Sequence, residues 1–307
     1  MLNRGDSVAD PLSMSGNEAG SACRYAPHTR DGAGEDVEGL AEELRIRRRL
    51  LDTVLLPVGA GWAGLPGVVA PSGLLLHGPD AALARPLVQA IAAAYDLQAA
   101  SVDVLDLLAD PGVSTPGEVA GALLRAAGPG PAVIELMGAD RVTRRRYLGP
   151  EAALEEGPVG AELLAAGLVE LRGDDPRHQP LIVAASEQPW EIDDDLLVRG
   201  ALDRSIFVPP PDWGRRRRIL ADLLGEGEAL DVVAATTDGW SVADVVGFAE
   251  GVAGTSTDDP AALLAEAANL TPTAEGWMSR AREMVDFASD RRRFDDLLGY
   301  LRRYRQS

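Results

Sequence analysis

Short apolar runs alternate with longer helical patterns along residues 73–211, and this alternation is the feature that most constrains the fold. Five runs are expected to be strands: GLLLHG, AASVDV, PAVIEL, PLIVAAS and SIFVPPP, with helical patterns after each of the first three. Strands that alternate with helices in this way are typical of a parallel sheet covered on both faces. The sequence therefore predicts an α/β fold with three layers around a parallel sheet.

The composition changes twice along the chain and predicts three parts. Residues 1–36 are rich in Gly, Ser, Ala, Asp and Asn without an apolar period, which predicts a disordered tail. Residues 37–210 are predicted to form the sheet-containing domain; its first amphipathic helix runs into Leu55–Pro57, before a connection with the sequence GWAGLPGVVAPSG. Three consecutive prolines end this domain and only helical patterns follow, so residues 211–307 are predicted to form a small all-helical domain.

Charge and residue usage exclude several classes of function. The 307-residue chain has a net charge of −19, which argues against general binding to nucleic acid or to an anionic membrane. A single cysteine and three histidines without ligand spacing predict no metal centre. The sequence has neither a run of ~18 apolar residues nor a signal-peptide pattern, so a cytoplasmic protein is expected. All 29 basic residues are arginines, because the chain contains no lysine.

Five segments, in order along residues 40–307, resemble motifs of the AAA family of ATPases. They are GLLLHGPDAALAR (family pattern GxxLLYGPPGTGKT), PAVIELMGAD (PAVIFIDEID), IVAASEQPWEID (VIAATNRPWDID), LLVRGALDRSIFVPPPD (LLRPGRFDRxIxVPPPD) and GWSVADV (GYSGADI). The C-terminal stretch resembles the last helices of some bacterial members. The resemblance implies a P-loop NTPase-like sheet domain, a helical lid after it, and an oligomeric assembly.

The departures from the family pattern fall on its catalytic positions. Ala84 stands at the position of the phosphate-binding lysine, and Arg85 at that of the hydroxyl that holds Mg²⁺. Met137 and Gly138 replace the acidic pair that holds the metal and activates water, and Glu187 replaces the sensor asparagine. The resulting degenerate nucleotide pocket comprises Gly78, Pro79, Asp80, Ala84, Arg85, Met137, Gly138 and Glu187. It is predicted to contain no catalytic residue, no metal ligand and no bound cofactor.

Two arginines leave alternatives open. Arg85 could cradle a phosphate without metal, but the favoured interpretation is an ion pair with Asp80 or Glu187 that fills the pocket. In the family, two arginines reach the site of a neighbouring subunit; the first is Ala201 in this chain and only Arg204 remains. Arg204 is therefore either a finger acting on a partner or the ion-pair partner of a nearby carboxylate.

Three functions follow from the missing groups, since phosphoryl transfer is catalysed almost wholly by positioning and charge stabilisation. The favoured one is a catalytically inactive pseudo-ATPase: a scaffold, structural or regulatory subunit that docks on partner proteins, such as an active AAA ATPase. The alternatives are a divergent AAA ATPase that uses Mg·ATP, and a module that binds a nucleotide without hydrolysing it. A membrane or a nucleic acid is not an expected partner.

Overall fold

The computed structural model describes residues 45–141, 159–172, 175–252, 259–287 and 291–304, and the predicted tail at residues 1–36 lies outside them. Its centre is a five-stranded sheet in which every neighbouring pair is parallel, in the order β2-β3-β4-β1-β5. The strands are β1 (Gly73–His77), β2 (Gln98–Asp103), β3 (Ala132–Met137), β4 (Leu181–Ser186) and β5 (Arg204–Phe207). All five predicted strands are confirmed, and the chain has the predicted α/β fold.

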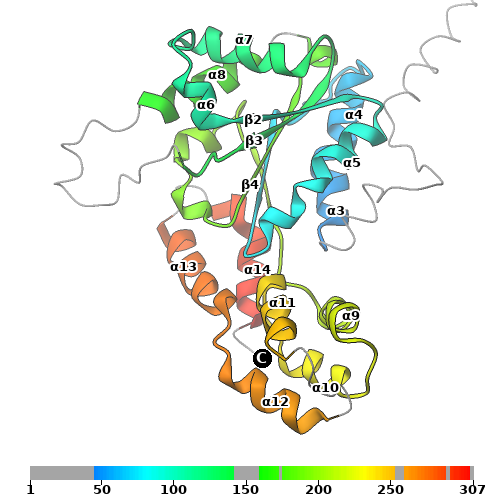
Figure 1. The fold of residues 1–307 in the computed structure, drawn as a ribbon. Coiled ribbons are helices and arrows are strands. Elements are labelled where there is room, and N and C mark those ends of the chain that lie inside the picture. The colour runs from blue at the N-terminus through cyan, green and yellow to red at the C-terminus, as the bar shows by residue number, and fades with distance from the viewer. Residues whose placement is uncertain (1–44, 142–158, 173–174, 253–258, 288–290, 305–307) are drawn as a thin grey trace, which may run out of the picture.

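Alternation along β1 separates two hydrophobic cores. Leu74 and Leu76 face one core and Leu75 the other, because successive side chains of a strand point to opposite faces. Helices cover both faces (Figure 1), which explains why β1 is buried along its whole length. The first face carries α3 (Arg47–Leu50), α4 (Leu56–Trp62) and α5 (Pro86–Ala94), and the second carries α6 (Val104–Ala109), α7 (Pro116–Ala127) and α8 (Val159–Leu171).

The first helix continues beyond the point where the sequence predicts its end. A π-helical turn, Leu51–Leu55, joins α3 to α4, and Pro57 lies in the first turn of α4. Proline has no N–H to donate and its ring clashes with a carbonyl in a regular α-helix, so the wider π turn accommodates it. Trp62 then packs into the core and donates its indole N–H to the Gln179 carbonyl at 2.7 Å. Burial of Trp62 therefore favours helix where Gly and Pro content predicts a connection.

The C-terminal helices fall into two groups. Four of them, α9 (Trp213–Leu224), α10 (Ala229–Thr236), α11 (Val242–Gly251) and α12 (Pro260–Asn269), share a hydrophobic core of their own and form the lower part of Figure 1. The last two, α13 (Thr273–Phe287) and α14 (Asp295–Tyr304), place Trp277, Met278 and Leu297 in the core of the sheet. The domain boundary at residue 210 stays a prediction, while the packing assigns α13 and α14 to the sheet. Within the described ranges, no helix has the length and apolar character needed to cross a membrane.

Candidate functional site

The candidate site is the loop that leaves the carboxyl end of β1, where parallel α/β sheets commonly bind ligands. Gly78 opens the loop under a tight constraint: a Cβ atom at this residue would lie 2.0 Å from the Val208 carbonyl oxygen. Its N–H donates to the Ser186 carbonyl at 3.4 Å, which ties the loop to β4. The close approach of β1, β4 and the segment after β5 thus requires glycine at this position.

Hydrogen bonds within the loop use several of its own N–H groups. Ala81, Leu83 and Arg85 donate to the carbonyl oxygens three residues before them, those of Gly78, Asp80 and Ala82. Residues Ala81–Ala84 accordingly form a 3-10 turn. In a phosphate-binding loop, such N–H groups point at the ligand. Here these three are already satisfied by the protein.

Residue 84, which sequence resemblance matches to the phosphate-binding lysine, faces the hydrophobic core. Ala84 has no exposed surface and packs in the same core as Leu74 and Leu76. The residue before it, Leu83, is the exposed one, with 41% of its surface accessible. A longer side chain at residue 84 would therefore enter the core rather than the solvent side of the loop.

Arg85 forms an ion pair, but with a different partner from the two predicted. Its Nε donates to Glu135 Oε1 at 2.6 Å and its Nη2 to Met137 Sδ at 2.8 Å. The other oxygen of Glu135 accepts the hydroxyl of Ser101 at 2.7 Å. Glu135 is 8% exposed, and a carboxylate so buried requires a cation. The strands provide this arrangement, since Ser101 and Glu135 are paired in the β2–β3 register.

Asp80 accepts a hydrogen bond from the four-helix group, whereas Arg85 pairs with Glu135. Its Oδ1 accepts the N–H of Val242, the first residue of α11, at 2.9 Å. Burial raises the pKa of Asp80 to about 7, and the charges of Glu187 and Asp244 act in the same direction. The Val242 N–H and Arg215 act in the opposite direction. This contact joins two segments 162 residues apart, and no local pattern in the sequence predicts it.

Glu187 places a second carboxylate against the loop. Burial raises its pKa, and a hydrogen bond from the Ala82 N–H opposes that shift. The main-chain oxygen of Glu187 accepts the indole N–H of Trp277 at 2.6 Å, which fixes the residue under α13. One loop N–H group, that of Ala82, thus meets a carboxylate of the same chain. Trp277 is a site residue that the sequence resemblance did not identify.

The segment after β3 has no carboxylate at the two positions of the family's acidic pair. Met137 ends β3 and contacts Arg85, and Gly138 turns the chain with φ +72°. Asp140, two residues further on, accepts the hydroxyl of Ser186 at 2.6 Å. Among the residues that the structure describes, no cluster of three His, Cys, Asp or Glu side chains is placed to hold a metal ion.

Arg204 begins β5, at the end of the sheet opposite to the loop. It is paired with Leu74 in the β1–β5 register, whereas the loop follows His77. Its guanidinium is exposed and donates to the main-chain oxygen of Asp203 at 3.0 Å rather than to the Asp203 carboxylate. Ala201, at the other finger position, is fully buried. Arg204 is therefore directed at solvent, away from the loop of its own chain.

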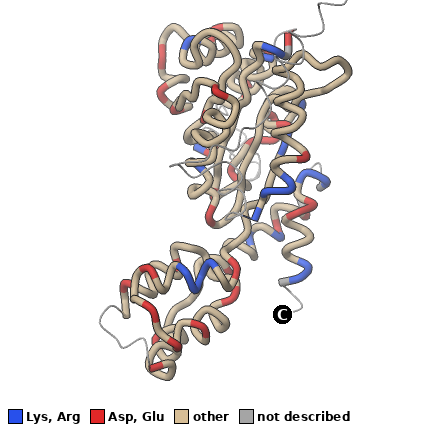
Figure 2. Tube along the Cα trace, turned by 90° about the vertical axis from the view of Figure 1, so that its right-hand side faces the viewer, with Lys and Arg blue, Asp and Glu red and all other residues tan. Residues whose placement is uncertain are grey.

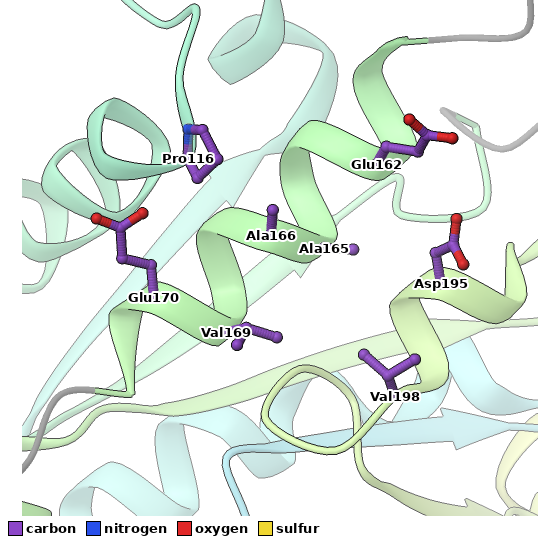
Figure 3. A pocket seen from close by; sticks show the side chains of 8 residues that line it. All are labelled: Pro116, Glu162, Ala165, Ala166, Val169, Glu170, Asp195 and Val198. Carbon is purple, nitrogen blue, oxygen red and sulfur yellow. The ribbon is translucent and has the colours of Figure 1, made fainter.

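A groove of about 490 Å³ lies elsewhere, between α8 and the short 3-10 helix Asp194–Leu197 (Figure 3). Ala165, Ala166, Val169 and Val198 form its apolar floor. Acidic side chains lie at its ends, among them Glu170 beside Pro116. The groove contains none of the residues predicted to form the nucleotide pocket.

Comparison with known proteins identifies relatives over much of the chain. No family model matches it. It is 29% identical over 220 residues to cell division control protein 48 homolog B of Arabidopsis thaliana, covering 70% of this chain and 36% of the relative. It is 31% identical over 187 residues to the ATP-dependent zinc metalloprotease FtsH 1 of Symbiobacterium thermophilum, covering 58% and 30%. It is 28% identical over 233 residues to ATPase family gene 2 protein homolog B of Homo sapiens, covering 69% and 30%. The chain spans about a third of the length of these relatives.

Proposed function

We propose that this chain, whose similarity to AAA ATPases supports its place in that family, is a catalytically inactive member that acts as a scaffold or regulatory subunit. It would dock on partner proteins, and the partner that fits best is an active AAA ATPase. The divergent-ATPase alternative is compatible with the same similarity.

The orientation of residue 84 carries the proposal. A phosphate-binding lysine must reach the β- and γ-phosphates, but Ala84 is sealed in the core. No lysine elsewhere in the chain can substitute, because there is none. A triphosphate above this loop would lack the cation on which its binding and transfer depend.

The carboxylates of the site would also repel a bound triphosphate. Glu187 already accepts the Ala82 N–H. Two like charges ~4 Å apart repel by roughly 4 kcal/mol at an effective dielectric constant near 20. Arg85, the cation within the loop, is held by Glu135 at 2.6 Å. Met137 and Gly138 supply no carboxylate to hold Mg²⁺ in compensation.

The partner is suggested by Arg204. An exposed arginine directed away from its own loop is placed where another molecule could meet it. A second copy of this chain would present the same lysine-free loop, so a partner with a working site fits better. A cytoplasmic location for such an assembly stays a prediction.

Melting of the purified chain with and without Mg·ATP, combined with a phosphate-release assay, tests the inactive state. A ligand at 100 times its dissociation constant would add ~2.7 kcal/mol of stability. We expect no shift in melting temperature and no phosphate release; the FtsH 1 relative serves as the positive control. A shift without release would select the non-hydrolysing module, and release would select the divergent ATPase.

Isolation of the native complex tests the partner. We expect mass spectrometry to identify an AAA ATPase with an intact phosphate-binding lysine, and Arg204→Ala to change the ATPase rate of the purified complex. Arg199→Ala, another exposed arginine five residues earlier, is the matched control and should leave that rate unchanged. Equal rates for both variants would contradict a finger role for Arg204.

A further inference from the structure

We propose that Asp80 is a proton-operated latch between the β1 loop and the four-helix group, firmly closed in mildly acidic solution and loosened at neutral pH and above. The contact is one hydrogen bond, from the Val242 N–H to Asp80 Oδ1 at 2.9 Å. Its donor is the first residue of α11, so the bond closes the helix N-terminus onto the loop. Figure 1 places α11 on the side of its group that faces the sheet.

The surroundings of Asp80 make the ionised form costly. The residue is 4% exposed, and its Oδ2 has no hydrogen-bond partner among the described residues. A buried oxygen of this kind is expensive when it carries charge. The single hydrogen bond at Oδ1 offsets only part of that cost.

The charged groups around the latch are mostly negative. Glu187 comes from the segment after β4 and Asp244 from α11, where it completes the capping box with Ser241. The opposing cation is Arg215 of α9, whose Arg215–Arg218 run forms the blue stretch on the otherwise acidic group in Figure 2. Arg85 is paired with Glu135 at 2.6 Å rather than with Asp80.

Protonation therefore favours the closed contact. The pKa of Asp80 is raised from 3.8 to about 7 when it is closed over Val242. The pKa of an open, solvated Asp80 would return to its ordinary value, so the closed state binds the proton more tightly than the open state does. The closed state is then lost progressively as pH rises between about 4 and 7, by at most tenfold per pH unit.

Amide hydrogen exchange at Val242, corrected for the intrinsic pH dependence of exchange, tests the latch in the full chain. We expect protection to fall at least tenfold between about pH 5 and about pH 7.5. Asp80→Asn keeps an oxygen for the Val242 N–H but cannot ionise, so its protection should not change with pH. Asp259→Asn is the matched control, since Asp259 caps α12 by accepting the Ala261 and Ala262 N–H groups at 3.1 Å. It should retain the wild-type response.

Two outcomes would overturn the latch: wild-type protection that does not change with pH, or an Asp80→Asn variant that responds like wild type. If that variant does not fold, the ¹³C shift of the Asp80 carboxyl in wild type gives the same answer. Its midpoint should lie near 7, and a midpoint near 3.8 refutes the proposal. Glu187→Gln removes one neighbouring negative charge and should move that midpoint to lower pH, whereas an unmoved midpoint counts against the mechanism.

Discussion

At the scale of single residues, Gly78 is the position where the loop tolerates least change. A Cβ atom there would meet the Val208 main-chain oxygen at 2.0 Å, so β1 and the segment after β5 would have to separate. We expect Gly78→Ala to lower the free energy of unfolding by about 3 kcal/mol, measured by urea denaturation. Gly247→Ala is the control: this glycine lies within α11 with open space around it, and alanine there should stabilise by about 0.5–1 kcal/mol. Equal effects at the two positions would refute the steric argument.

A second residue-scale prediction concerns restoring the missing lysine. Ala84→Lys would bury an amine in the core, where burial can lower a lysine pKa by ~3 units, a cost of about 4 kcal/mol. We expect urea denaturation to show this loss of stability, and we expect no increase in melting temperature when Mg·ATP is added. Leu83→Lys, at the exposed neighbour, should change stability by no more than about 0.5 kcal/mol. Stabilisation of the Ala84→Lys variant by Mg·ATP would show that a side chain at residue 84 can leave the core and reach a nucleotide.

At the scale of elements, α14 is part of the sheet's core rather than of the four-helix group. Asp296 accepts the Phe207 N–H at 2.8 Å, and Leu297 beside it is fully buried. We expect Leu297→Ala to lower the free energy of unfolding by about 2–5 kcal/mol, as for other buried leucines. Leu223→Ala removes the same atoms from α9, where the side chain is 51% exposed, and should cost less than about 1 kcal/mol. Guanidinium titration followed by circular dichroism separates the two results, and a small loss at Leu297 would contradict this assignment.

Elements that depend on neighbouring residues could be predicted from the sequence. The pattern around Thr115 predicts a capping box, and the structure has it: Thr115 accepts the Glu118 N–H while the Glu118 carboxylate accepts the Thr115 N–H. Such a motif is decided within four residues. The five strands were likewise predictable from short runs that contain apolar residues, although Gln98, Ser101 and Asp103 make half of β2 polar.

The site depends on contacts between distant segments, and there the sequence predicted less. Arg85 was correctly expected to form an ion pair, but its partner is 50 residues away and was misidentified. The β2–β3 register that pairs Ser101 with Glu135 is a feature of the folded sheet that the sequence alone does not reveal. Nothing local distinguishes Ala84 facing the core from Ala84 facing solvent, since alanine suits both environments.

At the scale of the whole molecule, two buried groups change the free energy of unfolding in opposite directions as the pH changes. His77 ends β1 between the rings of Phe207 and Phe294, and neither ring nitrogen has a hydrogen-bond partner among the described residues. Burial lowers the pKa of His77 to about 4, against the attraction of Asp296. Since the unfolded histidine binds its proton near pH 6.5, acidification from there to about 4 destabilises the fold. Asp80 has the opposite effect on stability. Because its pKa is raised in the folded state, the folded chain binds this proton at a higher pH than the unfolded chain does, so acidification stabilises the fold.

The opposite effects of His77 and Asp80 on the free energy of unfolding both occur between about pH 4 and 6.5. Each effect therefore masks the other in the wild-type chain. Variants should separate them in urea denaturation at several pH values. His77→Leu removes the pH-dependent contribution of His77. The stability of this variant relative to wild type should therefore rise steadily as the pH falls through that window. Asp80→Asn removes the pH-dependent contribution of Asp80. The free energy of unfolding of this variant should exceed that of wild type most above pH 7, and the difference should vanish near pH 4. A stability difference between wild type and either variant that stays constant with pH would mean that the corresponding group titrates alike in the folded and unfolded chain. The pH response of the fold would then have to come from its exposed carboxylates rather than from these two groups at the carboxyl end of β1.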